Sequence, residues 1–171
     1  HMIYPENFET KIKFDKIRQL ISNNCLSDMG RELVNDIKFS FDAEWIRTSL
    51  AETSEFMQIC QEEDSFPVSY YHDVRPFLLR VRVEGLFLEV NELVILKNSL
   101  ESLNAIMRFF NNNQERYPHL IARAGDVRVF PYILQRLDSI VSKFGTIKDS
   151  ASPALGNIRH SITKKQSGIS R

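Results

Sequence analysis

The feature that most constrains this chain is a long amphipathic repeat between residues 90 and 110. Apolar residues recur there at steps of 3, 4, 3, 4 and 3, namely Leu93, Leu96, Leu100, Leu103, Met107 and Phe110. This spacing places the side chains on one face of an α-helix. Val90, Val94 and Ile106 widen the stripe, which predicts packing against more than one neighbour. No alternating strand pattern of useful length occurs elsewhere, so we expect an all-α fold.

Helix-start signals divide the rest of the chain into shorter helices. Ser27, Asp42 and Asp73 are predicted N-caps, because their side chains can accept hydrogen bonds from free first-turn amides. Further breaks are expected at Pro67, at Gly85, at residues 111–113, and at Gly145, which should close a helix that begins at Pro131 and includes Val141 and Phe144.

The helix predicted from Asp42 carries a heptad-like apolar seam, which we expect to be its packed face. The seam consists of Ile46, Leu50, Met57 and Cys60, with Thr53 at the remaining position. Trp45 and Phe56 flank this seam and are expected to be core residues, because aromatics at helical spacing more often fill a core than stack on bases.

The segment after Ser152-Pro153 is predicted to be a helix with both an apolar face and a basic character. Its apolar residues are Leu155, Ile158, Ile162 and Ile169, and its cations are Arg159, Lys164, Lys165 and Arg171. No stop signal precedes Arg171, so we expect a final helix cut by the end of the chain. Cations along a helix can follow a phosphate backbone. The alternative is a solvated face whose cations pair with acids elsewhere in the fold.

The sequence contains no recognisable catalytic, nucleotide-binding or metal-binding motif. The six glycines are too dispersed to cradle a phosphate. Cys25 and Cys60 form no CxxC pair, which favours free thiols in a reducing cytoplasm. The histidines at positions 72, 119 and 160 fall in different predicted elements, and we expect them to be solvated or at the boundary of the core. Lys plus Arg and Asp plus Glu both number 22, so no global charge points to a polyanion.

Two acidic features leave alternatives open. Glu62-Glu63-Asp64 can bind a divalent ion or act in acid–base chemistry, but a solvated helix end is favoured. The Asp-Val-Arg sequences at 73–75 and 126–128 are interpreted as capping and ion-pair positions. No apolar run reaches the roughly 20 residues that span a bilayer, so no membrane association is expected.

Several segments together resemble one protein family. They are residues 14–21 (FDKIRQLI), 25–27 (CLS), 30–33 (GREL), 62–67 (EEDSFP), 73–76 (DVRP), and above all 145–155 (GTIKDSASPAL) with Ile158-Arg159. In order and spacing they are similar to the start of the bacterial MutS type-two proteins, the mismatch-repair-like paralogues that lack the mismatch-reading front domains. The resemblance spans residues 2–171, with His1 as a cloning scar.

The resemblance implies a helical core over residues 2–150 and the start of a long lever helix over 151–171, leading to a missing clamp. Members of the family are described as cytoplasmic homodimeric ATPases, dependent on ATP and magnesium, that usually carry an Smr endonuclease domain. They are linked to suppression of homologous recombination through branched-DNA binding, and to rescue of collided ribosomes. No family catalytic residue maps onto this chain, so the fragment itself is expected to be non-catalytic.

Three hypotheses follow from these observations. In the first, the chain is a rigid helical module that transmits nucleotide-driven motion. In the second, its last helix binds nucleic-acid phosphates, with duplex or branched DNA as the partner. In the third, it is a free-standing interaction domain that binds a partner helix through the apolar strip Leu86-Phe87-Leu88.

Overall fold

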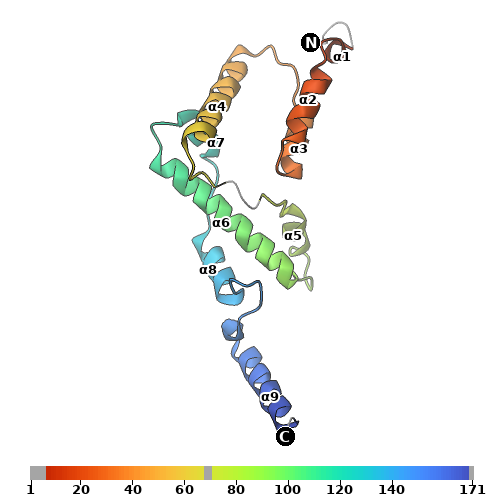
Figure 1. Ribbon diagram of the computed structural model, residues 1–171, viewed down its shortest axis with the longest axis vertical. Helices are drawn as coiled ribbons and strands as arrows, with labels where there is room; N and C mark the ends of the chain where they lie inside the picture. Colours follow the sequence, from red (N-terminus) through yellow and green to blue (C-terminus); the bar gives the residue numbers. More distant parts are fainter. Residues whose placement is uncertain (1–6, 68–70, 170–171) are drawn as a thin grey trace.

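The computed structural model describes residues 7–67 and 71–169, and this part of the chain is all-α, as predicted. The helices are α1 (Phe8–Lys11), α2 (Phe14–Asn23), α3 (Asp28–Asn35), α4 (Ala43–Glu62), α5 (Arg75–Arg80), α6 (Val90–Asn112), α7 (Pro118–Ala124), α8 (Pro131–Ile140), the 3₁₀ turn η1 (Asp149–Ala151) and α9 (Pro153–Ile169). They form an elongated arrangement, with α1 near one end of the long axis and α9 at the other (Figure 1).

Predicted cap residues begin several of these helices. The Ser27 hydroxyl accepts a hydrogen bond from the Gly30 amide at 3.1 Å. One Asp42 oxygen accepts from the amides of Glu44 and Trp45 at 3.0 and 3.1 Å. Asp73 accepts from the Arg75 amide at 3.0 Å, although α5 itself begins two residues later, at Arg75. These bonds satisfy first-turn amides that otherwise have no partner within the helix.

Helix α6 follows the predicted long repeat and forms the central strut of the molecule (Figure 1). Glu89 and Glu92 form a reciprocal capping box at its start. Leu96 and Phe110 of the predicted stripe are buried. Helix α8 packs on α6, and Lys97 bridges to Asp138 at 2.7 Å across this contact. The prediction that α6 packs against more than one neighbour is therefore confirmed. One neighbour is α8, and the others form the core described next.

The hydrophobic core lies where α4, the end of α6 and α7 meet. Its buried residues are Ile59, Phe109, Phe110 and Tyr117, with Phe66, Ile106, Leu120, Ile121 and Ala124 packed around them. The Tyr117 ring stacks on Phe109, with centroids 5.9 Å apart. This cluster joins segments far apart in the sequence, because α4 and α7 lie side by side (Figure 1).

The predicted packed face of α4 is wrong. Ile46, Leu50, Met57 and Cys60 all face solvent, and Leu50 is 65% exposed, whereas Ile59 is fully buried. Trp45 and Phe56 are also exposed rather than buried, although the edge of Phe56 meets the Phe66 ring. The physical reason is that α7 covers the opposite side of α4. On that side, glutamates of α4 accept hydrogen bonds from backbone amides and side chains of α7. Periodicity identifies an apolar face but not whether a neighbour covers it.

The end of α8 also differs from the prediction. The helix stops at Ile140, and Val141 is buried in an isolated antiparallel bridge with Ile147. Gly145 adopts φ +74°, which turns the intervening segment back on itself and leaves Phe144 exposed. A left-handed residue at this position favours glycine, because an L side chain is strained there. Gly145 therefore closes a turn rather than a helix.

Much apolar surface remains uncovered in this arrangement. The accessible surface is 13599 Å², against roughly 8,700 Å² for a compact monomer of this mass. Exposed residues include Leu20, Leu33, Phe87 and Ile169. Residues 7–67 and 71–169 thus enclose one modest core and present additional apolar faces to their surroundings.

Candidate nucleic-acid interface

Arg159 of α9 is engaged within the chain. Its guanidinium donates to the Ile147 carbonyl at 2.9 Å and to an Asp149 carboxylate oxygen at 2.5 Å. These bonds tie the first turns of α9 to η1, the element against which α9 packs. Arg159 therefore pairs with an acid of the fold, which is the alternative to phosphate binding given in the sequence analysis.

Lys164 and Lys165 are exposed on the outer half of α9 and form no ion pair with residues 7–67 or 71–169. At about 100° per residue they point ~100° apart, and Arg159 lies ~140° from Lys164. The three cations therefore do not line one face. Lys164 and Lys165 can reach two phosphates from neighbouring sides of the helix, whereas Arg159 points away. The fourth predicted cation, Arg171, lies outside the described residues.

Most of the acids between residues 42 and 64 pair with side chains of α7 or of the residues just before it. Arg116 donates to Glu62 at 2.8 Å and also pairs with Glu63, which accepts a bond from the buried Tyr117 hydroxyl at 3.1 Å. Glu62 and Glu63 are thus structural ion-pair partners within the fold. In the described part of the chain, no group of three or more His, Cys, Asp or Glu residues has a metal-binding arrangement.

Glu55 forms the closest link between α4 and α7. One carboxylate oxygen accepts from the His119 amide at 3.0 Å and lies 2.7 Å from His119 Nδ1, and the other accepts from the Leu120 amide at 2.9 Å. Burial alone raises the pKa of Glu55, but these hydrogen bonds outweigh it and lower the pKa below its ordinary value. An acid of one helix therefore caps the N-terminus of another. We call this contact the Glu55 clasp.

The remaining predicted positions have simple surroundings. Cys25 is half-buried, with its thiol near the Ile21 carbonyl, and Cys60 is exposed. Asp73 and Arg75 form the predicted ion pair at 2.7 Å, and Arg75 also reaches Glu32 at 3.0 Å. The Asp-Val-Arg sequence at 126–128 lies instead in the loop between α7 and α8, with no ion pair to the described residues. The strip at 86–88 presents an exposed Leu86 and an even more exposed Phe87.

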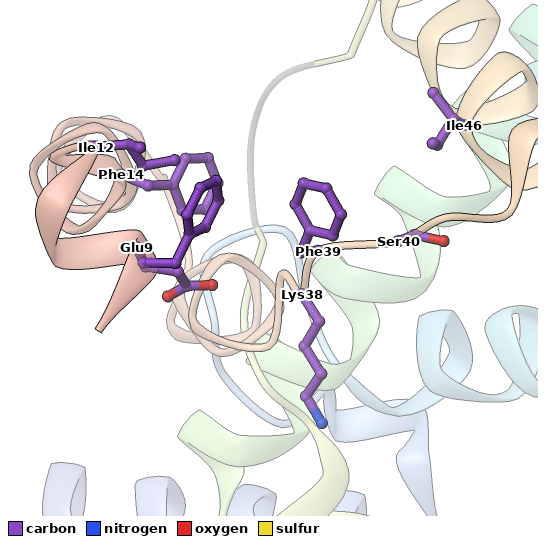
Figure 2. A pocket seen from close by; sticks show the side chains of 8 residues that line it. Glu9, Ile12, Phe14, Lys38, Phe39, Ser40 and Ile46 are labelled. Carbon is purple, nitrogen blue, oxygen red and sulfur yellow. The ribbon is translucent and has the colours of Figure 1, made fainter. Parts of the chain in front are cut away.

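One feature of the structure has no counterpart among the sequence predictions. A pocket of about 250 Å³ lies between the N-terminal helices and the segment that leads to α4 (Figure 2). It is lined by Phe8, Glu9, Ile12, Phe14, Lys38, Phe39, Ser40 and Ile46. We call it the aromatic pocket. The signal in the sequence is the alternation of basic and apolar residues at 11–14, although only the fold brings Phe39 to it.

Comparisons with known proteins bear on the resemblance found in the sequence. No protein-family model matches the chain. A curated protein named Endonuclease MutS2 from Alkaliphilus oremlandii is 27% identical over 160 residues, which is 92% of this chain and 20% of that protein. Proteins of the same name from Symbiobacterium thermophilum and Staphylococcus saprophyticus are 28% and 29% identical over 88% and 92% of this chain. The resemblance is therefore confirmed, and the chain spans about a fifth of the length of the curated relatives it matches. None of the helices in the described part of the chain combines the length and the hydropathy that a membrane span requires.

Proposed function

From its relatedness to the MutS2 endonucleases, we propose that this chain is the helical core of a MutS2-like protein, with residues 151–171 as the first part of its lever. In this proposal the chain has no catalytic role of its own. ATP and Mg²⁺ binding and nuclease activity belong to other parts of a homodimeric parent. Branched DNA, or a stalled ribosome, is the target of the whole protein.

The observation that carries the proposal is the uncovered apolar surface together with the match to only a fifth of the relatives. Contiguous apolar patches on a soluble protein mark surfaces that another body covers. A free-standing interaction domain needs one such face, whereas here exposed apolar residues occur on α2, α3, α4, α5 and α9. This distribution favours a part of a larger assembly. Reading the gene beyond codon 171 tests it: continuation into a GxxxxGK[ST] motif supports the proposal, and an immediate stop codon contradicts it.

The proposed mechanical role rests on α6, because packed helices move as rigid bodies. Glu101 and Arg108 are exposed on this helix, and glycine at each is expected to weaken the helix by about 1 kcal/mol. In the complete protein, E101G/R108G should slow ATP-dependent release of DNA several-fold while the rate of ATP hydrolysis stays near that of the parent.

The matched control is E101A/R108A, which removes the same side chains but preserves helix stiffness. Release should be slowed by the glycine pair and not by the alanine pair. Equal release rates for the two variants would exclude a role of α6 stiffness in transmission.

A second candidate function is nucleic-acid contact through Lys164 and Lys165, which is supported by their exposure and lack of ion pairs in the described structure. If each neutralises one phosphate, K164A/K165A should lower the slope of log affinity against log salt by about 1.8. The measurement is fluorescence anisotropy with duplex and four-way-junction DNA between about 50 and 200 mM salt.

The control variant for this experiment is R128A/R136A, which removes the same net charge from the loop before α8 and from α8 itself. An equal change of slope in both variants would show a general charge effect. An unchanged slope for K164A/K165A would leave α9 without a role in DNA binding.

A further inference from the structure

We propose that the aromatic pocket binds one unpaired nucleobase of a single-stranded nucleic acid, with the adjoining phosphates held by the lysines around it. Its volume of about 250 Å³ has room for one base. Phe8 and Phe39 stand edge to face with centroids 6.0 Å apart, and Phe39 is 51% exposed. An accessible aromatic ring beside cations is the combination that binds single strands, because every base has a face that stacks.

The charges around the pocket favour a polyanion. Lys38 lines the pocket, and Lys11, Lys13 and Lys16 lie within two positions of the lining residues Ile12 and Phe14 in sequence. These four lysines are exposed and form no ion pair with the described residues, and they outnumber the exposed acids Asp15 and Asp36 of the same two segments. Glu9, the acid in the pocket wall, is engaged by both terminal nitrogens of Arg18 at 3.1 and 3.2 Å. A nucleic-acid strand carries one phosphate per nucleotide and so meets several of these lysines at once. The alternative occupant, an apolar side chain of a protein, makes no use of them.

Both walls of the pocket are held in place without a ligand. Lys13 adopts φ +59°, a left-handed conformation that turns the chain sharply between α1 and α2. Arg18, on α2, donates to the Ile37 carbonyl at 2.9 Å and so fixes the segment that carries Lys38 and Phe39. Figure 2 shows Phe39 on this segment opposite Ile12, which follows α1, and Phe14 of α2. A preformed site loses less conformational entropy on binding.

The test compares two fluorescein-labelled probes of about 12 nucleotides, oligothymidylate and an abasic strand of the same length, by anisotropy with the 171-residue chain. Base stacking contributes about 1–3 kcal/mol per base, so oligothymidylate should bind at least fivefold more tightly than the abasic strand. F39A and F39L should both abolish this difference, whereas F39W should retain it. Leucine keeps the apolar contact but has no ring to stack.

The matched control is F87A, because Phe87 is also exposed, at 76%, and lies far from the pocket in sequence. It should leave the preference for oligothymidylate unchanged. Equal binding of the two probes, or an unchanged preference in F39L, would overturn the proposal. Displacement of oligothymidylate by polyglutamate at equal charge concentration would also overturn it and indicate an acidic protein partner.

The pocket is separate from α9, because α1 and α2, which contribute Phe8 and Phe14 to its lining, lie at the opposite end of the molecule from α9 (Figure 1). K164A/K165A removes charge from α9 only and should lower the affinity for both probes equally. The ratio between the probes therefore reports on the pocket, and the common change reports on α9. If base binding in the pocket fails the test, phosphate binding by α9 can still be measured, and the reverse also holds.

Discussion

Shortening Ile59 to alanine is expected to lower the free energy of unfolding of the α4–α7 core by about 3 kcal/mol. The side chain is fully buried among Phe109, Phe110 and Tyr117, so its loss removes apolar contacts and leaves a cavity. The measurement is urea unfolding followed by near-ultraviolet circular dichroism, which reports on the packed Tyr117 ring.

The comparison variant for I59A is L50A, because Leu50 belongs to the seam that periodicity predicts to be packed. It is exposed in the structure, and its replacement is expected to change stability by no more than about 0.5 kcal/mol. A loss for L50A as large as that for I59A would mean that α4 packs through its predicted seam after all.

Removing the Glu55 clasp is expected to have the second largest effect. E55A leaves two first-turn amides of α7 without their acceptor and should cost about 2 kcal/mol. The Glu55 side chain is only 12% exposed, so water replaces it poorly. E52A is the control: Glu52 pairs with an exposed Arg123 at 3.0 Å, a kind of pair that contributes less than about 1 kcal/mol.

The clasp also predicts a pH dependence. The pKa of Glu55 is lower in the folded protein than its ordinary value of 4.5. The ionised carboxylate therefore stabilises the fold at neutral pH, and this contribution is lost as the pH falls below 4.5 and through the lowered pKa. E55Q should lack this part of the acid destabilisation. Parallel stability curves for the parent and E55Q between pH 5 and 3 would contradict the assignment.

Local signals in the sequence predicted most of the elements. Ser27, Asp42 and Ser152 mark helix starts through bonds to nearby amides, and such bonds depend only on residues close in sequence. The long repeat at 90–110 gives α6 for the same reason. All-α character follows directly, because no segment offers the alternation that strands need.

The partners of these elements were not predictable in the same way. Nothing near Glu55 indicates that its carboxylate caps a helix more than 60 positions later, at His119 and Leu120. The sequence favours a solvated helix end for Glu62-Glu63-Asp64, but Glu62 and Glu63 pair with Arg116, and this pairing depends on the path of the whole chain. Because these long-range pairs place α7 on the acidic side of α4, the predicted apolar seam of α4 faces solvent. The same limitation hid the aromatic pocket, because Phe8 and Phe39 meet only after α1, α2 and α3 have folded.

For the proposed site on α9, the sequence identified the residue types but not their availability. Arg159 was a candidate for phosphate binding, yet it is bound to Asp149 ten positions earlier. Lys164 and Lys165 remain candidates, because the geometry leaves them exposed. A cation count along a helix therefore overstates the number of phosphates that the helix can reach.

The side-by-side placement of α4 and α7 has a consequence for how this chain folds. Other helix contacts, such as α1 with α2, α2 with α3, and η1 with α9, join neighbours along the chain and form with little loop-closure entropy. The hydrogen bond from Tyr117 to Glu63 joins residues that are 54 positions apart. Because closing so long a loop costs more entropy, the α4–α7 contact should form last. Hydrogen exchange should accordingly show segments that open independently, in the manner of repeat arrays, rather than one global unfolding event.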